Sequence, residues 1–215
     1  MSGSSFLYPH LAATSSPSGD RGESAFDELV AAARTSWDIG VALDAATLRA
    51  NDLGLDRAAA LLVQGTSTGN QILALGNGGS ACDADRFARL LGPRFPARSM
   101  LDPAVLSALA NDVGASRMFD RQVETFVRPG DVVAVFSTSG TSTNVLAALS
   151  AARQAGAATI VFAGYRGASL HQNADVDVCL HVDSSSVHRI QEAQGALCDE
   201  LAGRVTKAIT AKMTS

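Results

Sequence analysis

Two kinds of apolar pattern alternate along this chain. Short, nearly continuous apolar runs rich in Val, Ile and Ala are separated by longer segments whose apolar residues recur every three or four positions. Continuous runs predict strands buried on both faces, and the longer pattern predicts amphipathic helices. The predicted strands cover 71–76, 97–102, 131–137, 158–164 and 176–182.

The helical pattern fills the intervals between these strands. The predicted helices cover 24–37, 56–65, 81–92, 116–127, 142–156 and 186–212. Such alternation is typical of an α/β fold, a three-layer sandwich in which helices cover both faces of a parallel sheet. Residues 1–23 are rich in Ser, Gly and Pro and lack periodicity, so they predict a flexible N-terminal tail. We therefore expect a single domain with N-terminal helices over 24–215.

Composition narrows the classes of protein to which the chain can belong. It has 215 residues, 47% hydrophobic and 18% charged, with a formal net charge of −4 and no basic run. These features argue against nucleic-acid binding, and no apolar stretch reaches membrane-spanning length. The N-terminus does not resemble a secretory signal. Three cysteines without a C-x-x-C pair favour a reducing, cytoplasmic location.

The loop after the first predicted strand is rich in glycine. It reads GNGGSACD over 76–83 and leads into the helix at 81–92. Glycine lets backbone N–H groups approach a ligand closely, and a helix N-terminus carries unpaired N–H groups and partial positive charge. The loop therefore predicts an anion or phosphate site, although it could also be a purely structural turn.

The loop after the third predicted strand is rich in hydroxyl groups. It reads STSGTST over 137–143, where six of seven residues carry a hydroxyl. Helix capping requires one or two such residues, so the excess favours a phosphate site. Both loops follow strands of the predicted sheet, and open α/β sheets bind ligands at that edge.

A dinucleotide site is an alternative interpretation of the first loop. Gly76, Gly78 and Ala81 fit the pattern G-x-G-x-x-G/A, and Asp102 stands near the distance expected for a ribose-binding acid. This interpretation leaves the hydroxyl-rich loop unexplained. A Walker-type phosphate loop does not fit, because no lysine follows the glycines.

Four segments together resemble the phosphoheptose isomerases, sugar isomerase (SIS) domain proteins that act on sedoheptulose 7-phosphate. The segments are GNGGSACDADRFARLLGPRF, ALANDVG, FSTSGTSTNVLAAL and RIQEAQGALCDEL. They occur in the family's order, and the resemblance spans about residues 25–212. It implies a flavodoxin-like SIS fold with a five-stranded parallel sheet, and a homotetramer whose active sites lie between subunits.

The resemblance also implies a set of substrate-binding residues. The phosphate would bind the second loop, through Ser137, Thr138, Ser139 and Ser142. The sugar would contact the first loop, through Asn77, Gly78, Gly79 and Ser80. Arg94 and Asp112 fall on further positions that line the family's site.

This chain departs from the family where the family carries its acid and base. The family has His and Glu four residues apart on the helix after the first loop, and here Arg86 and Leu90 stand there. Its catalytic His on the last helix corresponds to Asp199, whereas its Gln is kept as Gln191. His188 replaces an Asp three residues before that Gln. Because aldose–ketose isomerisation requires proton transfer, Leu90 cannot take the role of the Glu.

A rebuilt catalytic set is conceivable on the last helix. His188, Gln191 and Asp199 share a broad face of that helix and are the catalytic candidates, with Asp83 or Asp85 as an additional acid. Simpler interpretations also exist for His188 and for the acids. Each could be a solvated surface residue, or, for an acid in the first turn of a helix, a charge that stabilises the helix dipole.

The same substitutions bear on metal binding. Some family members bind zinc through the His, Glu, Gln and C-terminal His positions, and only Gln191 is unchanged here, with Asp199 a possible ligand. Arg86 would repel a cation, so we expect no metal at that site and no other cofactor. Arg86 itself could pair with Asp199, bind substrate oxygens or lie at the surface.

Two leading hypotheses about function remain beside the dinucleotide alternative. The first is a protein that binds sedoheptulose 7-phosphate or a related sugar phosphate, and isomerises it only if the acid and base have been rebuilt. The second is a non-catalytic SIS regulator, scaffold or pseudoenzyme partner of an active paralogue. The partners expected are a sugar phosphate and either identical subunits in a homotetramer or a paralogue in a mixed oligomer, without nucleic acid or membrane.

Overall fold

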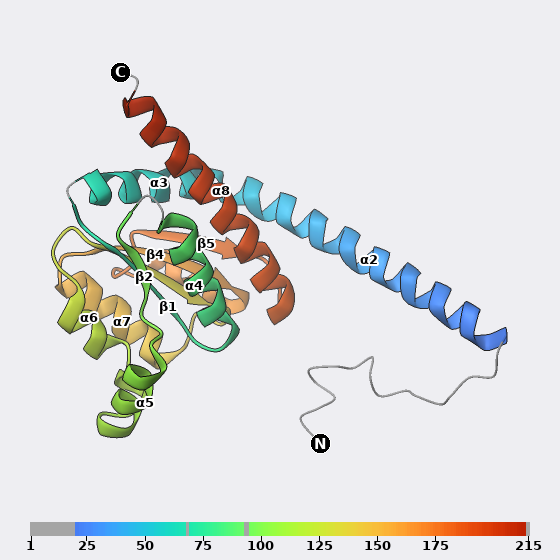
Figure 1. Ribbon diagram of the computed structural model, residues 1–215, viewed down its shortest axis with the longest axis horizontal. Coiled ribbons are helices and arrows are strands. Elements are labelled where there is room, and N and C mark those ends of the chain that lie inside the picture. Colours follow the sequence, from blue (N-terminus) through green and yellow to red (C-terminus); the bar gives the residue numbers. More distant parts are fainter. Residues whose placement is uncertain (1–19, 68, 93–94, 214–215) are drawn as a thin grey trace. The chain divides into compact units, whose positions relative to one another are not determined.

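The computed structural model describes residues 20–67, 69–92 and 95–213 (Figure 1). The chain divides into two compact units, one up to Val41 and one from Ala42 onward. Most of the predicted tail lies outside the described residues, and the domain boundary at residue 24 stays a prediction. In the described ranges, no helix is long and apolar enough to cross a membrane.

The second unit is built on one five-stranded sheet, and all its strand pairs are parallel. The strands are β1 (Ile72–Gly76), β2 (Ala97–Ser99), β3 (Val132–Ser137), β4 (Ala158–Gly164) and β5 (Val178–Val182). Their spatial order is β2-β1-β3-β4-β5. This is the flavodoxin-like order, so the predicted fold class is confirmed. The order reverses between β1 and β3, and open α/β sheets bind ligands outside the carboxyl ends of the strands at such a point, a region that we call the crevice.

Helices cover both faces of the sheet, as predicted (Figure 1). In chain order they are α2 (Asp20–Ala50), α3 (Asp52–Ser67), α4 (Gly79–Leu91), α5 (Pro103–Asp112), α6 (Asp120–Phe126), α7 (Thr143–Gln154) and α8 (Val187–Met213). Two short 3-10 helices are η2 (Ala115–Arg117) and η3 (Tyr165–Gln172). The helices α3, α4 and α8 pack on one face, and α6 and α7 pack on the other.

The arrangement of the core explains why the strand sequences are nearly continuous in apolar residues. Alternate residues of each strand point to opposite faces, and both faces are buried. On the α4 side, the rings of Phe136 and Phe162 stack with centroids 4.2 Å apart. Phe87 of α4 meets Phe162 edge-on at 5.4 Å. This aromatic cluster fixes α4 against the sheet directly behind the crevice.

The structure differs from the predicted elements after β2. The predicted strand over 97–102 stops at Ser99, and the pattern analysis missed α5. Asp102 caps this helix, since its carboxylate accepts hydrogen bonds from the backbone N–H groups of Ala104 and Val105 at 2.9 and 3.0 Å. Pro103 occupies the first turn, where proline is favoured.

The single helix predicted over 116–127 is also divided, into η2 and α6. Gly114 has a φ of 91° immediately before η2, a conformation that glycine adopts readily. A turn at Met118 and Phe119 then separates η2 from α6.

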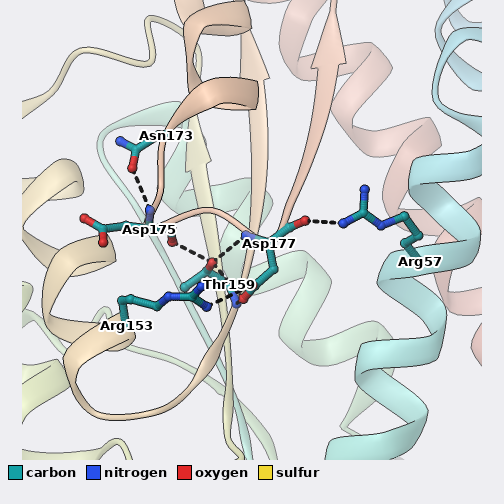
Figure 2. A network of polar contacts seen from close by, with 6 residues as sticks. All are labelled: Arg57, Arg153, Thr159, Asn173, Asp175 and Asp177. Atoms are coloured by element: carbon teal, nitrogen blue, oxygen red, sulfur yellow. Dashed lines mark hydrogen bonds and ion pairs between the residues drawn. The ribbon is translucent and has the colours of Figure 1, made fainter.

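A polar network at the amino-terminal edge of the sheet holds β4 and β5 in register (Figure 2). The carboxylate of Asp177 accepts hydrogen bonds from the Thr159 backbone N–H at 2.8 Å and from Arg153 Nη1 at 2.9 Å. Thr159 Oγ1 accepts from the Asp177 N–H at 3.0 Å and lies 2.7 Å from the Asp175 carbonyl oxygen, to which it donates. Arg57 of α3 donates to the Asp177 carbonyl oxygen at 2.9 Å.

We expect Asp177→Ala to destabilise the protein by about 2–3 kcal/mol, because it leaves the buried Thr159 N–H without its acceptor and removes the Arg153 ion pair. Urea denaturation measures the change. Asp175→Ala is the matched control, since Asp175 joins this network through its backbone. Equal stability of the two variants would contradict the role given to Asp177.

Candidate functional site

The first loop is shaped by close backbone contacts at its start. A Cβ atom at Gly76 would lie 2.6 Å from the Ser80 carbonyl oxygen and 3.0 Å from that of Phe136. Gly78 follows with a φ of 55° and precedes α4 without providing a side-chain cap. The first turn of α4 therefore presents backbone N–H groups at the crevice. Ser80, the second residue of this turn, is buried.

The second loop uses part of its hydroxyl groups to hold its own shape. Ser137 Oγ accepts a hydrogen bond from the Gly140 N–H at 3.0 Å. Ser139 Oγ accepts from the Thr141 N–H at 3.3 Å. Ser142 stands at the N-cap of α7 but makes no side-chain cap hydrogen bond. Capping thus does not account for the hydroxyl cluster, which leaves the first turn of α7 open to an anion.

A reciprocal pair of hydrogen bonds joins the two loops. Asn77 Nδ2 donates to Asn144 Oδ1 at 2.9 Å, and Asn144 Nδ2 donates to Asn77 Oδ1 at 3.0 Å. Asn77 belongs to the first loop and Asn144 to the first turn of α7. The pair brings the amino-terminal ends of α4 and α7 together at the point where the strand order reverses.

Beside the crevice, α4 packs against α8 (Figure 1). We call the polar side-chain contact between these two helices the α4–α8 seam. The seam comprises Gly79, Asp83 and Arg86 of α4 with Gln191, Gly195 and Asp199 of α8. Gly79 lies so close to Gln191 that an added Cβ would stand 1.9 Å from Gln191 Nε2. The carboxamide of Gln191 is therefore held directly against the first turn of α4.

Farther along the seam, Arg86 and Asp199 form a two-pronged ion pair. Arg86 Nη2 donates to both carboxylate oxygens of Asp199, at 2.8 and 2.6 Å, and Nη1 donates to the Gly195 carbonyl oxygen at 3.0 Å. Of the three alternatives that the sequence left open for Arg86, the structure shows the pairing with Asp199. This pairing engages both carboxylate oxygens of Asp199 in charge-assisted hydrogen bonds.

Asp83 is the acid of the seam whose environment most disfavours its charge. Its Oδ2 atom is buried and has no hydrogen-bond partner in the described part of the chain. Burial raises the pKa of Asp83 to about 6, and the nearby positive charge of Arg86 opposes that rise. Cys198 faces the same cluster, and burial raises the pKa of its thiol, so it stays protonated and unreactive.

The remaining predicted residues are less closely connected with the crevice. His188 lies in the first turn of α8, exposed and without a hydrogen bond or ion pair to the described residues. Asp112 is exposed at the end of α5, where its carboxylate accepts from Asn111 Nδ2 at 2.9 Å. Arg94 lies outside the described residues. The structure thus brings Gln191 against the first loop and pairs Asp199 with Arg86, whereas His188 has no hydrogen bond or ion pair within the described ranges.

The outer face of α4 borders a cavity of about 580 Å³. Its lining residues are Ala81, Cys82, Asp85, Arg86, Arg89, Leu90 and Leu101. Leu90 presents an aliphatic side chain here. Asp85 is bound to Arg89 at 2.6 Å and to Ser99 at 2.8 Å, and these bonds lower its pKa. Asp85 is therefore a charged structural residue rather than the additional acid considered from the sequence.

The residues at the family's zinc positions do not fit a metal. Leu90 has no donor atom, and Arg86 directs its own positive charge at Asp199. Within the described ranges, no group of three or more His, Cys, Asp or Glu side chains could hold a metal ion. The dinucleotide alternative loses its ribose-binding acid as well, because the Asp102 carboxylate caps α5.

Comparisons with known proteins agree with this geometry. The model of the SIS domain family matches residues 41–164. The phosphoheptose isomerase of Trichlorobacter lovleyi is 42% identical over 150 residues, which cover 64% of this chain and 76% of that protein. The phosphoheptose isomerase of Roseiflexus sp. is 46% identical over 132 residues, covering 58% of this chain and 66% of that protein.

Solved structures are also similar. The phosphoheptose isomerase of Neisseria gonorrhoeae superposes with a TM-score of 0.77 at 31% identity, covering 85% of this chain and 99% of that one. The enzyme of that name from Francisella tularensis has a TM-score of 0.76 at 26% identity, with 83% and 98% coverage.

The environment of Asp83 predicts how stability changes with pH. A folded-state pKa of about 6 exceeds the ordinary value of 3.8, so the folded protein binds the proton more tightly than the unfolded chain. Stability therefore falls as the pH rises from about 4 through about 6. We expect Asp83→Asn to be more stable than the parent by about 1–2 kcal/mol at pH 7.5, with little difference near pH 4.

Urea denaturation at both pH values measures this effect. Asp85→Asn is the control, because the pKa of Asp85 is lowered and its charged form is the stabilising one. That variant should lose stability at pH 7.5 relative to the parent. A difference between Asp83→Asn and the parent that is the same at both pH values would contradict the buried-acid interpretation.

Proposed function

This chain belongs to the phosphoheptose isomerase group of the SIS domain family, and we propose that it binds sedoheptulose 7-phosphate or a related sugar phosphate in the crevice between the loops after β1 and β3. The observation that carries the proposal is the junction made by Asn77 and Asn144, which sets two helix N-termini without side-chain caps side by side. Phosphate is the common ligand of such N-termini.

We assign the phosphate group to the second loop. Thr138 and Ser142 have hydroxyl groups free of hydrogen bonds to the described chain. Ser137 and Ser139 accept backbone N–H groups and retain their own O–H groups as donors. Together with the N–H groups of α7 they can surround several phosphate oxygens.

We assign the sugar to the first loop and its surroundings. Gly78 and Gly79 are exposed and place the backbone at the crevice, with Asn77 and Ser80 beside them. Gln191, held against Gly79, can hydrogen-bond a sugar hydroxyl from the side of α8. Arg94 and Asp112 are proposed as additional contacts, on the resemblance alone.

Isomerisation would require a proton acceptor near the sugar. A base removes the proton from the carbon beside the carbonyl, the C–H electron pair forms the C=C bond of an enediol, and the carbonyl oxygen takes a proton from solvent. A proton is then delivered to the former carbonyl carbon, and the hydroxyl oxygen on the carbon that was deprotonated loses its proton to become the new carbonyl oxygen. For this chain we assign the base to His188, with Gln191 positioning the sugar and Asp199 fixed through Arg86.

A non-catalytic role is the second candidate, and the α4–α8 seam favours it. Leu90 cannot transfer a proton, and both oxygens of Asp199 are bound by Arg86. A protein with an intact phosphate loop and these substitutions could serve as a regulator, a scaffold or the inactive subunit of a mixed oligomer with an active paralogue. Its ligand would be the same class of sugar phosphate.

We expect the double variant Ser139→Ala/Ser142→Ala to bind sedoheptulose 7-phosphate more weakly, by about 1–3 kcal/mol for each charge-assisted hydrogen bond lost. Isothermal titration calorimetry measures the affinity. Ser107→Ala, on the exposed surface of α5, is the control and should bind as the parent does. Unchanged affinity in the double variant would rule out the phosphate assignment.

Catalysis is tested by following sedoheptulose 7-phosphate and the aldose product by NMR. We expect any conversion by the parent to disappear in His188→Gln. The affinity for the sugar phosphate should stay within about twofold, because His188 makes no hydrogen bond or ion pair in the part of the chain that the structure describes. Conversion that persists in His188→Gln would overturn the assignment of the base. Binding without conversion by the parent would place the protein in the non-catalytic class.

A further inference from the structure

The first residue after β4 adopts an unusual backbone conformation. Tyr165 has a φ of 48°, and among the described residues it is the one non-glycine residue with positive φ. Such a conformation is unfavourable for a bulky side chain and persists only where neighbours hold it. Here the Tyr165 N–H donates to the Ser184 carbonyl oxygen at 3.2 Å, and its own carbonyl oxygen lies 3.4 Å from His181 Nε2. The turn is thus supported by the segment around the end of β5.

This turn presents an aromatic ring and a cation to solvent. The Tyr165 side chain is exposed, and the Arg166 guanidinium lies 5.2 Å from the centroid of its ring. In the part of the chain that the structure describes, no ion pair involves Arg166. A cation–π contact orients a guanidinium without neutralising its charge, so Arg166 remains available to an anion.

The turn lies next to the second loop. β4 is the neighbour of β3 in the sheet, so η3 and the second loop start from the same edge. Gly140 of the loop packs on Gly167, and an added Cβ at Gly140 would stand 2.4 Å from the Gly167 Cα atom. Arg166 directly precedes Gly167, about 3.8 Å away between Cα atoms. Its long side chain therefore starts beside the hydroxyl-rich loop.

The second loop provides no cation of its own. Residues 137–143 contain only Ser, Thr and Gly. Hydroxyl groups and helix N–H groups bind phosphate oxygens, but they offset only part of the charge of a phosphate dianion. A guanidinium, with its planar fork of donors, matches two phosphate oxygens at once.

We propose that Arg166, oriented by the ring of Tyr165, is the cationic part of the phosphate site and selects phosphorylated sugars over neutral ones. The proposal rests on the proposed function, since it assigns the phosphate to the second loop. It adds a residue from the β4–η3 turn, outside the two loops and the seam. Arg166 binds the ligand in this role and takes no part in proton transfer.

The test compares Arg166→Gln with Arg98→Gln. Arg98 is a matched control, because it too is an exposed arginine over an aromatic ring, 4.6 Å from the centroid of Phe126, but it lies on the edge strand β2. Calorimetry with sedoheptulose 7-phosphate at low and high salt gives the affinity and its salt dependence. Inorganic phosphate serves as a second probe that lacks the sugar.

We expect Arg166→Gln to weaken binding of both probes about tenfold or more and to reduce the salt dependence, with Arg98→Gln within about twofold of the parent. Arg166→Lys should recover part of the affinity, because it keeps the charge but loses the fork. Thermal melting of each variant confirms that it folds.

Affinity and salt dependence unchanged in a folded Arg166→Gln would overturn the proposal. If Ser139→Ala/Ser142→Ala weakens binding in the same assay while Arg166→Gln does not, the second loop keeps the phosphate and only the role of Arg166 fails. A parent protein that binds neither probe contradicts the proposed function and this inference together.

Discussion

The hydrogen-bonded amides of Asn77 and Asn144 are the interaction on which the rest of the site depends. They join the loop after β1 to the first turn of α7, across the point where the sheet reverses its strand order. Each amide satisfies the other with one donor and one acceptor, so neither loop can shift alone without leaving a partly buried polar group unpaired. The glycine at the end of β1 makes this approach possible, because a side chain at Gly76 would meet the backbone of Ser80 and Phe136.

Behind this junction, the packing of α4 decides what the crevice can do. Phe87 holds α4 on the stacked rings of Phe136 and Phe162, which sets the face that α4 turns toward α8. That face carries a glycine against Gln191, a buried acid and an arginine. The same helix thus contributes backbone N–H groups at its first turn and one partner of an ion pair farther along.

The fold could be predicted from local pattern because β1, β3, β4 and β5 are almost entirely buried, which makes their sequences nearly continuous in apolar residues. The edge strand β2 is less buried, and only the first half of its predicted range is a strand. The glycine and hydroxyl loops were identified at the ends of β1 and β3. The helix α5 was missed although Asp102 and Pro103 mark its start, because Asp102 was considered as a ligand-binding acid instead of a cap. The division of the 116–127 helix falls at Met118 and Phe119, two apolar residues whose turn conformation the apolar pattern does not record.

The site was less predictable, because its key contacts join residues far apart in the sequence. Asn77 and Asn144 are 67 positions apart, and Arg86 and Asp199 are 113 apart. The resemblance pointed to Arg86 and Asp199 as substitutions and left their pairing as one of three alternatives, and the structure shows the two residues bonded to each other. The ion pair has a consequence for how such a chain changes over time. Both side chains are about half exposed, so an intermediate that has lost one of the two residues is less stable by only about 0–1 kcal/mol. This small cost leaves either position open to change before the other, so a lineage can exchange a neutral seam for this charged one in two single steps.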